Sequence, residues 1–260
     1  MKSSLKISCA LTLALLAGGA SAAPIYWTDW TGSDQDSGAG FIGSGTITTP
    51  TSTVTVTYTN PQGIGFYQTS GGTYYYSNGS DGPAGTSPYT SAQVDNRPPT
   101  TDIVALQYAG TQSLVFSQAI ANPVFAFVSL NGNGYGFDQD FDILSFGGAD
   151  GNACGYWGCG TSCKNIVTVN GKTEYQLLGT GEPHGTLRFT GTFDTVSWRS
   201  LSNENWNGFT VGVQETAVAF CTANPTAPEC SPVSAVPEPA SMALMGLGLA
   251  GLAAVRRRKA

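Results

Sequence analysis

The polar and apolar residues of the chain alternate over many short stretches. The clearest is 53–58, where Thr alternates with Val and Tyr, so that every second side chain points to the same face. The run 124–130 is almost continuously apolar, which is typical of a central strand. Further strands are predicted at 25–30, 64–68, 73–77, 102–108, 113–116, 137–146, 166–169, 172–178, 185–189, 194–201 and 209–213.

These stretches predict an all-β fold. The sequence has about a dozen short strands and no long helix-forming run in its body. The 34 Gly and 14 Pro of the chain supply many turns. We therefore expect one domain over 23–215, a two-sheet antiparallel sandwich that is jelly-roll-like.

Glycine-containing turns and one long loop connect the predicted strands. Asn170-Gly171 predicts a type I′ hairpin between 166–169 and 172–178. Gly71-Gly72 separates 64–68 from 73–77, which predicts a second hairpin. Residues 78–99 are polar and rich in Gly and Pro, and we expect them to form a long surface loop.

The first 22 residues have the pattern of a secretory signal peptide. Lys2 and Lys6 precede an apolar run over 10–16, and the small residues 20–22 form a cleavage site. The sequence therefore predicts export by the Sec machinery and a cut by signal peptidase before Ala23.

The last residues, 236–260, carry three signals in a fixed order. Pro237 and Pro239 keep Glu238 extended, which suits an enzyme that binds substrate backbone in its cleft. Residues 240–255 carry no charge and predict a C-terminal transmembrane helix. The cations that follow are expected to stay on the cytoplasmic side of the membrane; they are Arg256, Arg257, Arg258 and Lys259.

This order of Pro-Glu-Pro, apolar helix and basic cluster resembles the PEP-CTERM sorting signal, over about a tenth of the chain. The resemblance implies processing by the membrane protease exosortase in a Gram-negative bacterium that makes exopolysaccharide. It also implies transient anchoring in the inner membrane, followed by delivery to the cell surface or extracellular matrix. An ordinary C-terminal membrane anchor is the alternative. Residues 216–235, which contain Pro and Ala, would form a stem between domain and signal.

The charge of the mature body is strongly negative. Residues 23–235 contain five of the 11 basic residues and 16 of the 17 acidic ones, a net charge of −11. This balance lacks the basic footprint of a nucleic-acid-binding protein, so no nucleic-acid partner is expected. It favours solubility outside the cell and attraction for cations.

Five cysteines remain after the signal peptide is removed, and export places them in an oxidising compartment. Cys221 and Cys230 flank a short loop and are expected to pair. Cys154, Cys159 and Cys163 offer one bridge and one leftover thiol. A zinc site is the alternative, but it would require two close pairs and more histidine than the single His184.

Three aspartates follow one another at every second position. If the predicted strand 137–146 is continuous, Asp138, Asp140 and Asp142 point to one face, about 6.5–7 Å apart in succession. Such a group of carboxylates could hold Ca²⁺ in an exported protein. The favoured alternative is a solvated strand face.

Two stretches combine aromatic and polar residues that suit sugar binding. Tyr156 and Trp157 lie between cysteines, where a bridged loop would hold aromatic faces rigidly enough to stack on sugar rings. The candidate carbohydrate-binding residues are Tyr156, Trp157, Asn203, Glu204 and Trp206. Core packing is the alternative for Trp206, and the alternating run around Trp198 favours core packing for that residue.

A secreted hydrolase that acts on polysaccharide is the second functional hypothesis. Glu182 and Glu204 would be its paired carboxylates, which must lie about 5–10 Å apart. Glu182 is also two positions from His184, but no catalytic motif supports acid–base chemistry there, so a solvated or backbone-bonded His184 is preferred. No catalytic residue is assigned, and a structural or carbohydrate-binding exopolysaccharide-matrix protein is the first hypothesis.

Overall fold

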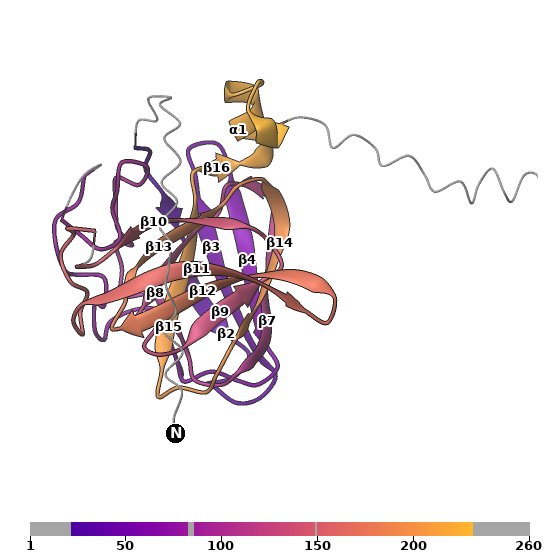
Figure 1. The fold of residues 1–260 in the computed structure, drawn as a ribbon. Coiled ribbons are helices and arrows are strands. Elements are labelled where there is room, and N and C mark those ends of the chain that lie inside the picture. Colours follow the sequence, from indigo (N-terminus) through magenta and orange to yellow (C-terminus); the bar gives the residue numbers. More distant parts are fainter. Residues whose placement is uncertain (1–21, 83–85, 149, 231–260) are drawn as a thin grey trace, which may run out of the picture.

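A computed structural model describes residues 22–82, 86–148 and 150–230, and within them two antiparallel sheets pack face to face (Figure 1). One sheet has the order β10-β13-β8-β15-β6-β5, with β1 paired to β15. Its strands are β1 (Tyr26–Trp27), β5 (Phe66–Gln68), β6 (Ile103–Leu106), β8 (Val124–Val128), β10 (Phe141–Phe146), β13 (Gly185–Phe189) and β15 (Asn207–Val213).

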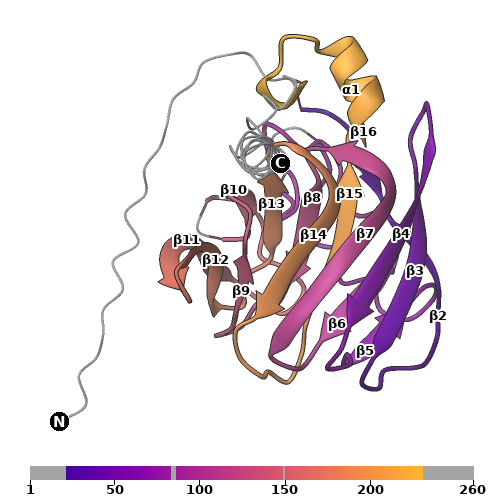
Figure 2. The same cartoon turned by 90° about the vertical axis from the view of Figure 1, so that its right-hand side faces the viewer.

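The other sheet has the order β11-β12-β9-β14-β7-β4-β3-β2, with β16 paired to β7. Figure 2 shows β14, β7, β4 and β3 side by side, with β15 and β8 behind them. The strands are β2 (Asp29–Ser33), β3 (Phe41–Thr48), β4 (Thr53–Asn60), β7 (Gly110–Ala121), β9 (Gly134–Phe137), β11 (Gly160–Val169), β12 (Lys172–Gly181), β14 (Thr192–Ser200) and β16 (Glu215–Thr216). The predicted two-sheet antiparallel sandwich is confirmed, and its jelly-roll-like character stays a prediction.

The core between the sheets follows from the alternation in the sequence. On β4, Val54, Val56 and Tyr58 are buried, whereas the threonines between them face solvent. Trp198 on β14 is also buried and packs against Tyr58 at 6.0 Å between ring centroids, so its predicted place in the core is confirmed. Burial of each such side chain contributes about 1.5–3 kcal/mol.

A second core lies on the outer side of the seven-stranded sheet. Alternate residues of β8 face opposite ways, so Phe125 enters the main core and Ala126 enters the second one. The second core is completed by Tyr76, Tyr89 and Val94, which are fully buried. The long segment before β6 therefore covers a sheet face, and this explains why β8 is apolar on both sides. Residues 78–99 are not merely the surface loop that their polarity predicts.

The predicted hairpin between 64–68 and 73–77 is wrong. β5 pairs instead with β6, in the register Phe66 to Ala105. Residues 73–77 form no strand, because their tyrosines are drawn into the second core, where Tyr76 is fully buried. By contrast, the predicted type I′ hairpin joins β11 to β12, with positive φ at Asn170 and Gly171.

Two predicted strands each divide between the sheets. Residues 25–30 contribute β1 to one sheet and β2 to the other, with a crossing at Thr28. Residues 137–146 likewise contribute β9 to one sheet and β10 to the other.

The sequence pattern does not predict β3, because the two glycines of this strand weaken the pattern. One of them, Gly45, leaves room for Trp30, whose ring would lie 2.9 Å from an added Cβ.

The C-terminal stem begins with a short helix that the sequence pattern did not predict. It is α1 (Ala217–Ala223), followed by a 3-10 helix, η1 (Pro228–Cys230). The Thr216 side chain caps α1 by accepting a hydrogen bond from the Ala219 N–H at 3.3 Å. Figure 2 shows α1 at one end of the sandwich, beyond β16.

The described ranges contain no helix with the length and apolar character needed to span a bilayer. The predicted signal peptide and the predicted transmembrane helix lie outside the described residues, apart from Ala22.

Candidate functional site

Two of the three exposed aromatic side chains of the described residues lie on one small loop, and the third is Tyr108. Trp157 is 53% exposed and Tyr156 is 41% exposed. A disulfide between Cys154 and Cys159 closes this loop, and the Gly158 N–H donates to the Gly155 carbonyl across it at 3.3 Å. Large apolar faces are thus held in solvent by a constrained backbone. The predicted single bridge among the three nearby cysteines is confirmed for these two.

The loop aromatics belong to a larger aromatic cluster. Ring centroids of Trp157 and Trp206 are 6.4 Å apart, and those of Tyr156 and Tyr75 are 5.2 Å apart. The rings meet edge to face, a geometry that favours aromatic packing. We call this set the aromatic cluster; its members are Phe66, Tyr75, Tyr156, Trp157 and Trp206.

The structure therefore brings together three of the predicted carbohydrate-binding residues from distant parts of the sequence. Phe66 and Tyr75, which sequence reasoning missed, support them. Tyr75 lies 5.0 Å from Trp206 and 5.2 Å from Tyr156, measured between ring centroids. In the sequence, the run of three tyrosines at 74–76 is the one local sign that this segment is partly buried. Large aromatic side chains are seldom all exposed to solvent.

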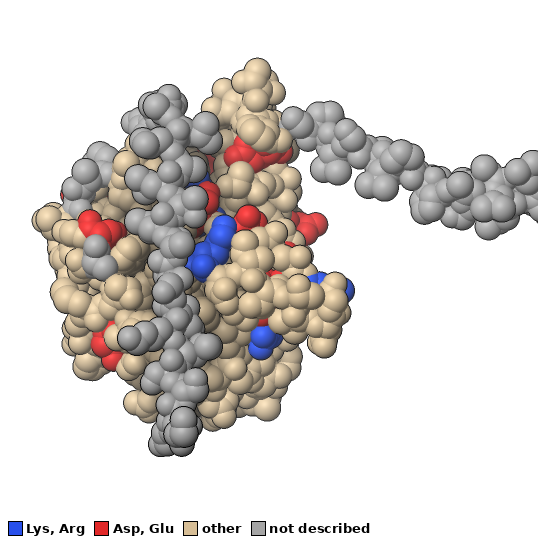
Figure 3. Space-filling model, in the orientation of Figure 1, with Lys and Arg blue, Asp and Glu red and all other residues tan. Residues whose placement is uncertain are grey.

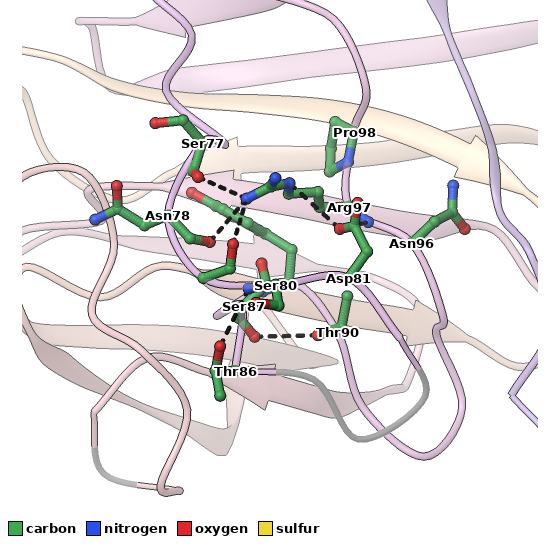
Figure 4. A network of polar contacts seen from close by, with 12 residues as sticks. Ser77, Asn78, Ser80, Asp81, Thr86, Ser87, Thr90, Asn96, Arg97 and Pro98 are labelled. Carbon is green, nitrogen blue, oxygen red and sulfur yellow. Dashed lines mark hydrogen bonds and ion pairs between the residues drawn. The ribbon is translucent and has the colours of Figure 1, made fainter.

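Hydrogen bonds fasten the aromatic loop to the segment before β6, and Figure 4 shows the part of this network around Arg97. The Asn78 side-chain amide donates to the carbonyls of Cys154 and Gly155 at 3.1 and 2.8 Å. Arg97 in turn donates from Nη1 to three successive carbonyls, those of Ser77, Asn78 and Gly79. Its Nε also lies 3.3 Å from an Asp81 carboxylate oxygen. Arg97 thus fixes the backbone that carries Asn78.

His184 lies beneath the same loop and cannot reach a ligand. Its side chain is fully buried, and an added Cβ on Gly155 would lie 1.9 Å from its ring. Nδ1 lies 3.1 Å from the Tyr89 hydroxyl, and burial lowers the His184 pKa to about 4. His184 is therefore a neutral support for the loop, bonded to a side chain rather than solvated or bonded to backbone as predicted.

Two glutamates converge on the turn that follows β8. Glu182 accepts hydrogen bonds from the Ser129 hydroxyl at 2.5 Å and from the Asn131 amide at 2.6 Å. Glu204 accepts from the Asn207 amide at 2.9 Å and also from the Asn131 backbone N–H. Because Asn131 contacts both carboxylates, the two glutamates form one acidic pair.

Burial, with a smaller contribution from the neighbouring Glu182 charge, raises the pKa of Glu204 to about 7. The acidic pair adjoins the aromatic cluster on both sides. An added Cβ on Gly158, the residue after Trp157, would lie 3.8 Å from Cβ of Glu182. Glu204 precedes Trp206 by two residues.

The side chain of Asn203 stabilises the backbone turn in which it lies. Its side-chain oxygen accepts a hydrogen bond from the Ala109 backbone N–H at 2.8 Å, and Glu204 N–H donates to the Gln107 carbonyl at 3.0 Å. These two bonds fix the turn that presents Glu204 and Trp206. Asn203 therefore positions the site, although its side chain remains exposed.

Charged side chains are sparse on the molecular surface, as the face in Figure 3 shows. Among the described residues, no Lys or Arg forms an ion pair with Glu182 or Glu204. The aromatic cluster and the acidic pair together form a surface of apolar faces and carboxylates, without a paired cation.

The three aspartates of the calcium hypothesis do not share a strand, so that prediction is wrong. β9 ends at Phe137 and β10 begins at Phe141 in the other sheet, with Asp138 and Asp140 in the crossing between them. A continuous strand would have placed Gln139 on the buried face shared by the two phenylalanines, and the crossing exposes it instead.

Cations of the protein itself pair with two of these aspartates. Lys164 Nζ lies 2.5 Å from Asp140, and an Arg188 nitrogen lies 3.6 Å from Asp142. The described part of the chain contains no group of three or more His, Cys, Asp or Glu side chains that could hold a metal ion.

A hollow of about 470 Å³ lies elsewhere, on the nine-stranded sheet between β9, β12 and β14. Two of its four charged side chains already satisfy each other, since Glu174 and Arg199 form two hydrogen bonds of 2.7 and 2.8 Å. The aromatic side chains that line the hollow, Phe137 and Trp198, are buried, so the exposed aromatic cluster is the better candidate site.

The other three cysteines of the described residues are also disulfide-bonded. Cys221 and Cys230 are bonded as predicted, and the bond joins α1 to η1. The predicted leftover thiol is wrong, because Cys163 is also disulfide-bonded and no cysteine of the described residues is free.

Comparison with known proteins concerns the C-terminal end, which lies outside the described residues. A family model described as the PEP-CTERM protein-sorting motif matches residues 235–259. This range contains Pro237, Glu238, Pro239 and the cluster from Arg256 to Lys259. No curated protein and no solved structure matches the chain.

Proposed function

We propose that this chain, which carries the PEP-CTERM protein-sorting motif, is an exported protein that binds carbohydrate at the cell surface or in an exopolysaccharide matrix. The motif indicates an exosortase substrate directed to the cell envelope. In the proposed route, the Sec machinery exports the chain and the apolar C-terminal helix holds it briefly in the inner membrane of a Gram-negative cell. Exosortase then processes it near Glu238.

The exposure of Trp157 is the main observation that supports carbohydrate binding. Trp157 is half exposed on a disulfide-closed loop, so burial of its side chain contributes little to the stability of the fold. Its position is nevertheless restrained by Asn78, which bonds the loop, and by the ring of Trp206. Preorganised aromatic faces of this kind bind the apolar faces of sugar rings at little entropic cost. The exposed amide of Asn131 and the acidic pair add hydrogen-bonding groups for hydroxyls.

Binding of polysaccharides tests this proposal. We expect Trp157→Ala to weaken binding of the host exopolysaccharide about tenfold or more, equivalent to about 1.4 kcal/mol. Titration calorimetry of the purified mature protein would measure it. Ile166→Ala is the control, because Ile166 is 58% exposed on β11, away from the cluster. Equal affinities of wild type and Trp157→Ala would contradict the proposal.

Polysaccharide hydrolysis is a second candidate function, and one observation favours it. The acidic pair places a carboxyl with a pKa of about 7, Glu204, beside a second carboxylate, Glu182. This is the combination of a proton donor and a carboxylate that glycoside hydrolysis needs. Release of reducing ends in the same titrations, lost in both Glu182→Gln and Glu204→Gln, would support hydrolysis. Binding without any release would leave carbohydrate binding alone.

A further inference from the structure

We propose that the ligand of the aromatic cluster and the acidic pair is an amino-sugar polysaccharide whose free amines carry positive charge. The inference rests on the proposed carbohydrate-binding function and names the class of its ligand. It follows from three features of the site: the sign of its charge, the chemistry of its exposed rings and the contacts of Arg97, the basic residue that is connected to the aromatic loop.

The charge at the site is negative, and below about pH 7 Glu182 carries it, because Glu204 keeps its proton there. Glu182 and Glu204 are half-buried beside Trp157 and Trp206, and the described residues place no Lys or Arg in an ion pair with either carboxylate. Their hydrogen-bond donors, such as Asn131 and Asn207, are neutral amides. A cationic ligand would supply the missing counter-charge, whereas a uronic acid would be repelled.

The exposed rings favour the same ligand. The face of an indole or phenol attracts a cation that lies within about 6 Å of the ring centre. Trp157 and Tyr156 are exposed on the loop whose Gly158 lies against the Glu182 side chain, so an ammonium group held by the carboxylate would lie near these rings. A neutral sugar would use the rings and hydrogen bonds to its hydroxyls, without a charge–charge attraction.

The basic residue that is connected to the aromatic loop is not available to compete. Arg97 is connected to the aromatic loop through Asn78, but its guanidinium is bound by the carbonyls of 77–79 and by Asp81. The other four described basic residues lie on β11 to β14, and three of them pair with Asp140, Asp142 and Glu174. The net charge of −11 over 23–235 adds a long-range attraction for a cationic polymer.

The test compares three soluble oligomers of equal length with the mature protein by titration calorimetry. They are hexamers of glucosamine, of N-acetylglucosamine and of glucose, in a slightly acidic buffer that protonates the free amines. We expect the glucosamine hexamer to bind about tenfold more tightly than the other two. Raising the salt concentration from about 0.02 to about 0.3 M should weaken only the glucosamine complex, because salt screens charge–charge attraction.

Two variants separate local attraction from the overall charge. Glu204 holds its proton in this buffer, because burial raises its pKa to about 7, so Glu182→Gln is the informative change. It should weaken glucosamine binding about fivefold and weaken N-acetylglucosamine binding clearly less. Asp194→Asn removes the same charge from an exposed position on β14 and should leave all three affinities unchanged.

The outcomes distinguish this inference from the function on which it rests. Equal binding of the three oligomers, lost in Trp157→Ala, would overturn the amino-sugar inference and keep the carbohydrate-binding proposal. Equal weakening by Glu182→Gln and Asp194→Asn would overturn the inference too, since the attraction would then be general. Absence of binding to every oligomer would overturn the inference, and failure with the host polysaccharide as well would overturn both.

Discussion

At the scale of single residues, Glu204 shows how the fold changes the chemistry of a side chain. It is half-buried, its carboxyl is bonded by the Asn207 amide, and the Glu182 charge lies close by. Burial disfavours the charged form, so the pKa of Glu204 rises to about 7. In the unfolded chain the same carboxyl loses its proton near its ordinary pKa of 4.5.

This difference predicts a pH dependence of stability. Between about pH 4.5 and about pH 7 the native protein keeps a proton that the unfolded chain has lost, so the Glu204 contribution to stability falls as the pH rises through this window. From pH 5 to pH 7.5 we expect wild type to lose about 1–2 kcal/mol relative to Glu204→Gln, allowing for the partial exposure of the carboxyl.

Thermal unfolding at a series of pH values would measure the effect. Asp194→Asn, which removes an exposed carboxylate on β14, should follow the wild-type profile. Parallel profiles for wild type and Glu204→Gln would show that Glu204 is ionised in the native state over the whole range.

At the scale of elements, the segment before β6 decides where the functional surface lies. It has almost no strand structure, yet it covers the outer face of the seven-stranded sheet and contributes Tyr76 and Tyr89 to the second core. Through Asn78 it also holds the disulfide-closed loop, 76 and 77 positions further along the chain. In place of strand hydrogen bonds, Arg97 stabilises the backbone of this segment by donating to three carbonyls.

Removal of Arg97 should therefore loosen the segment and the aromatic loop together. We expect Arg97→Ala to lower the free energy of unfolding by about 1.5–3 kcal/mol, the range for hydrogen bonds to a charged group. Denaturant titration would measure it, and the emission of Trp157 should shift as its loop gains freedom. Arg188→Ala is the control, since the single 3.6 Å contact of Arg188 to the exposed Asp142 is worth at most about 1 kcal/mol. Similar losses in the two variants would contradict the role given to Arg97.

At the scale of the whole molecule, the binding surface and the sorting motif occupy separate parts of the chain. The sandwich ends at β16, and the stem is closed by the disulfide from Cys221 to Cys230 before the matched residues 235–259 begin. Processing in the motif would thus leave the sandwich and its disulfides intact.

This separation predicts the outcome of a change in the motif. In the native host, wild type should be recovered outside the membrane with a mature mass that ends near Pro237–Pro239. Glu238→Ala should instead remain full-length and membrane-bound, with Arg256 to Lys259 still attached, while its sugar affinity after detergent extraction stays unchanged. Intact-mass spectrometry of membrane and extracellular fractions would decide. Wild type that is itself retained at full length would mean that the tail serves as an anchor only.

Much of the fold could be predicted from the sequence because it depends on local patterns. The alternation on β4, the apolar run of β8 and the Asn170-Gly171 turn each report which way a backbone segment faces or bends. Strands that cross between sheets could not be predicted, because residues 25–30 and 137–146 keep a strand pattern on both sides of the crossing.

The candidate site was predicted only in its parts. Tyr156, Trp157 and Trp206 were recognisable as residue types suited to sugar binding, but nothing local shows that their rings meet or that Tyr75 lies between them. The aspartates failed as a metal site for the opposite reason, because their spacing was regular and the strand that would have aligned them does not exist.

The sequence by itself determined the all-β class, the turn at Asn170-Gly171, the pairing of Cys221 with Cys230 and the sorting motif, because each is encoded by neighbouring residues. Tertiary structure alone decided where the aromatic and acidic side chains gather. Their contacts join segments that are distant in the chain, and those segments meet because buried tyrosines draw an otherwise irregular segment across a sheet face. That burial is a property of the whole core, which no local pattern contains.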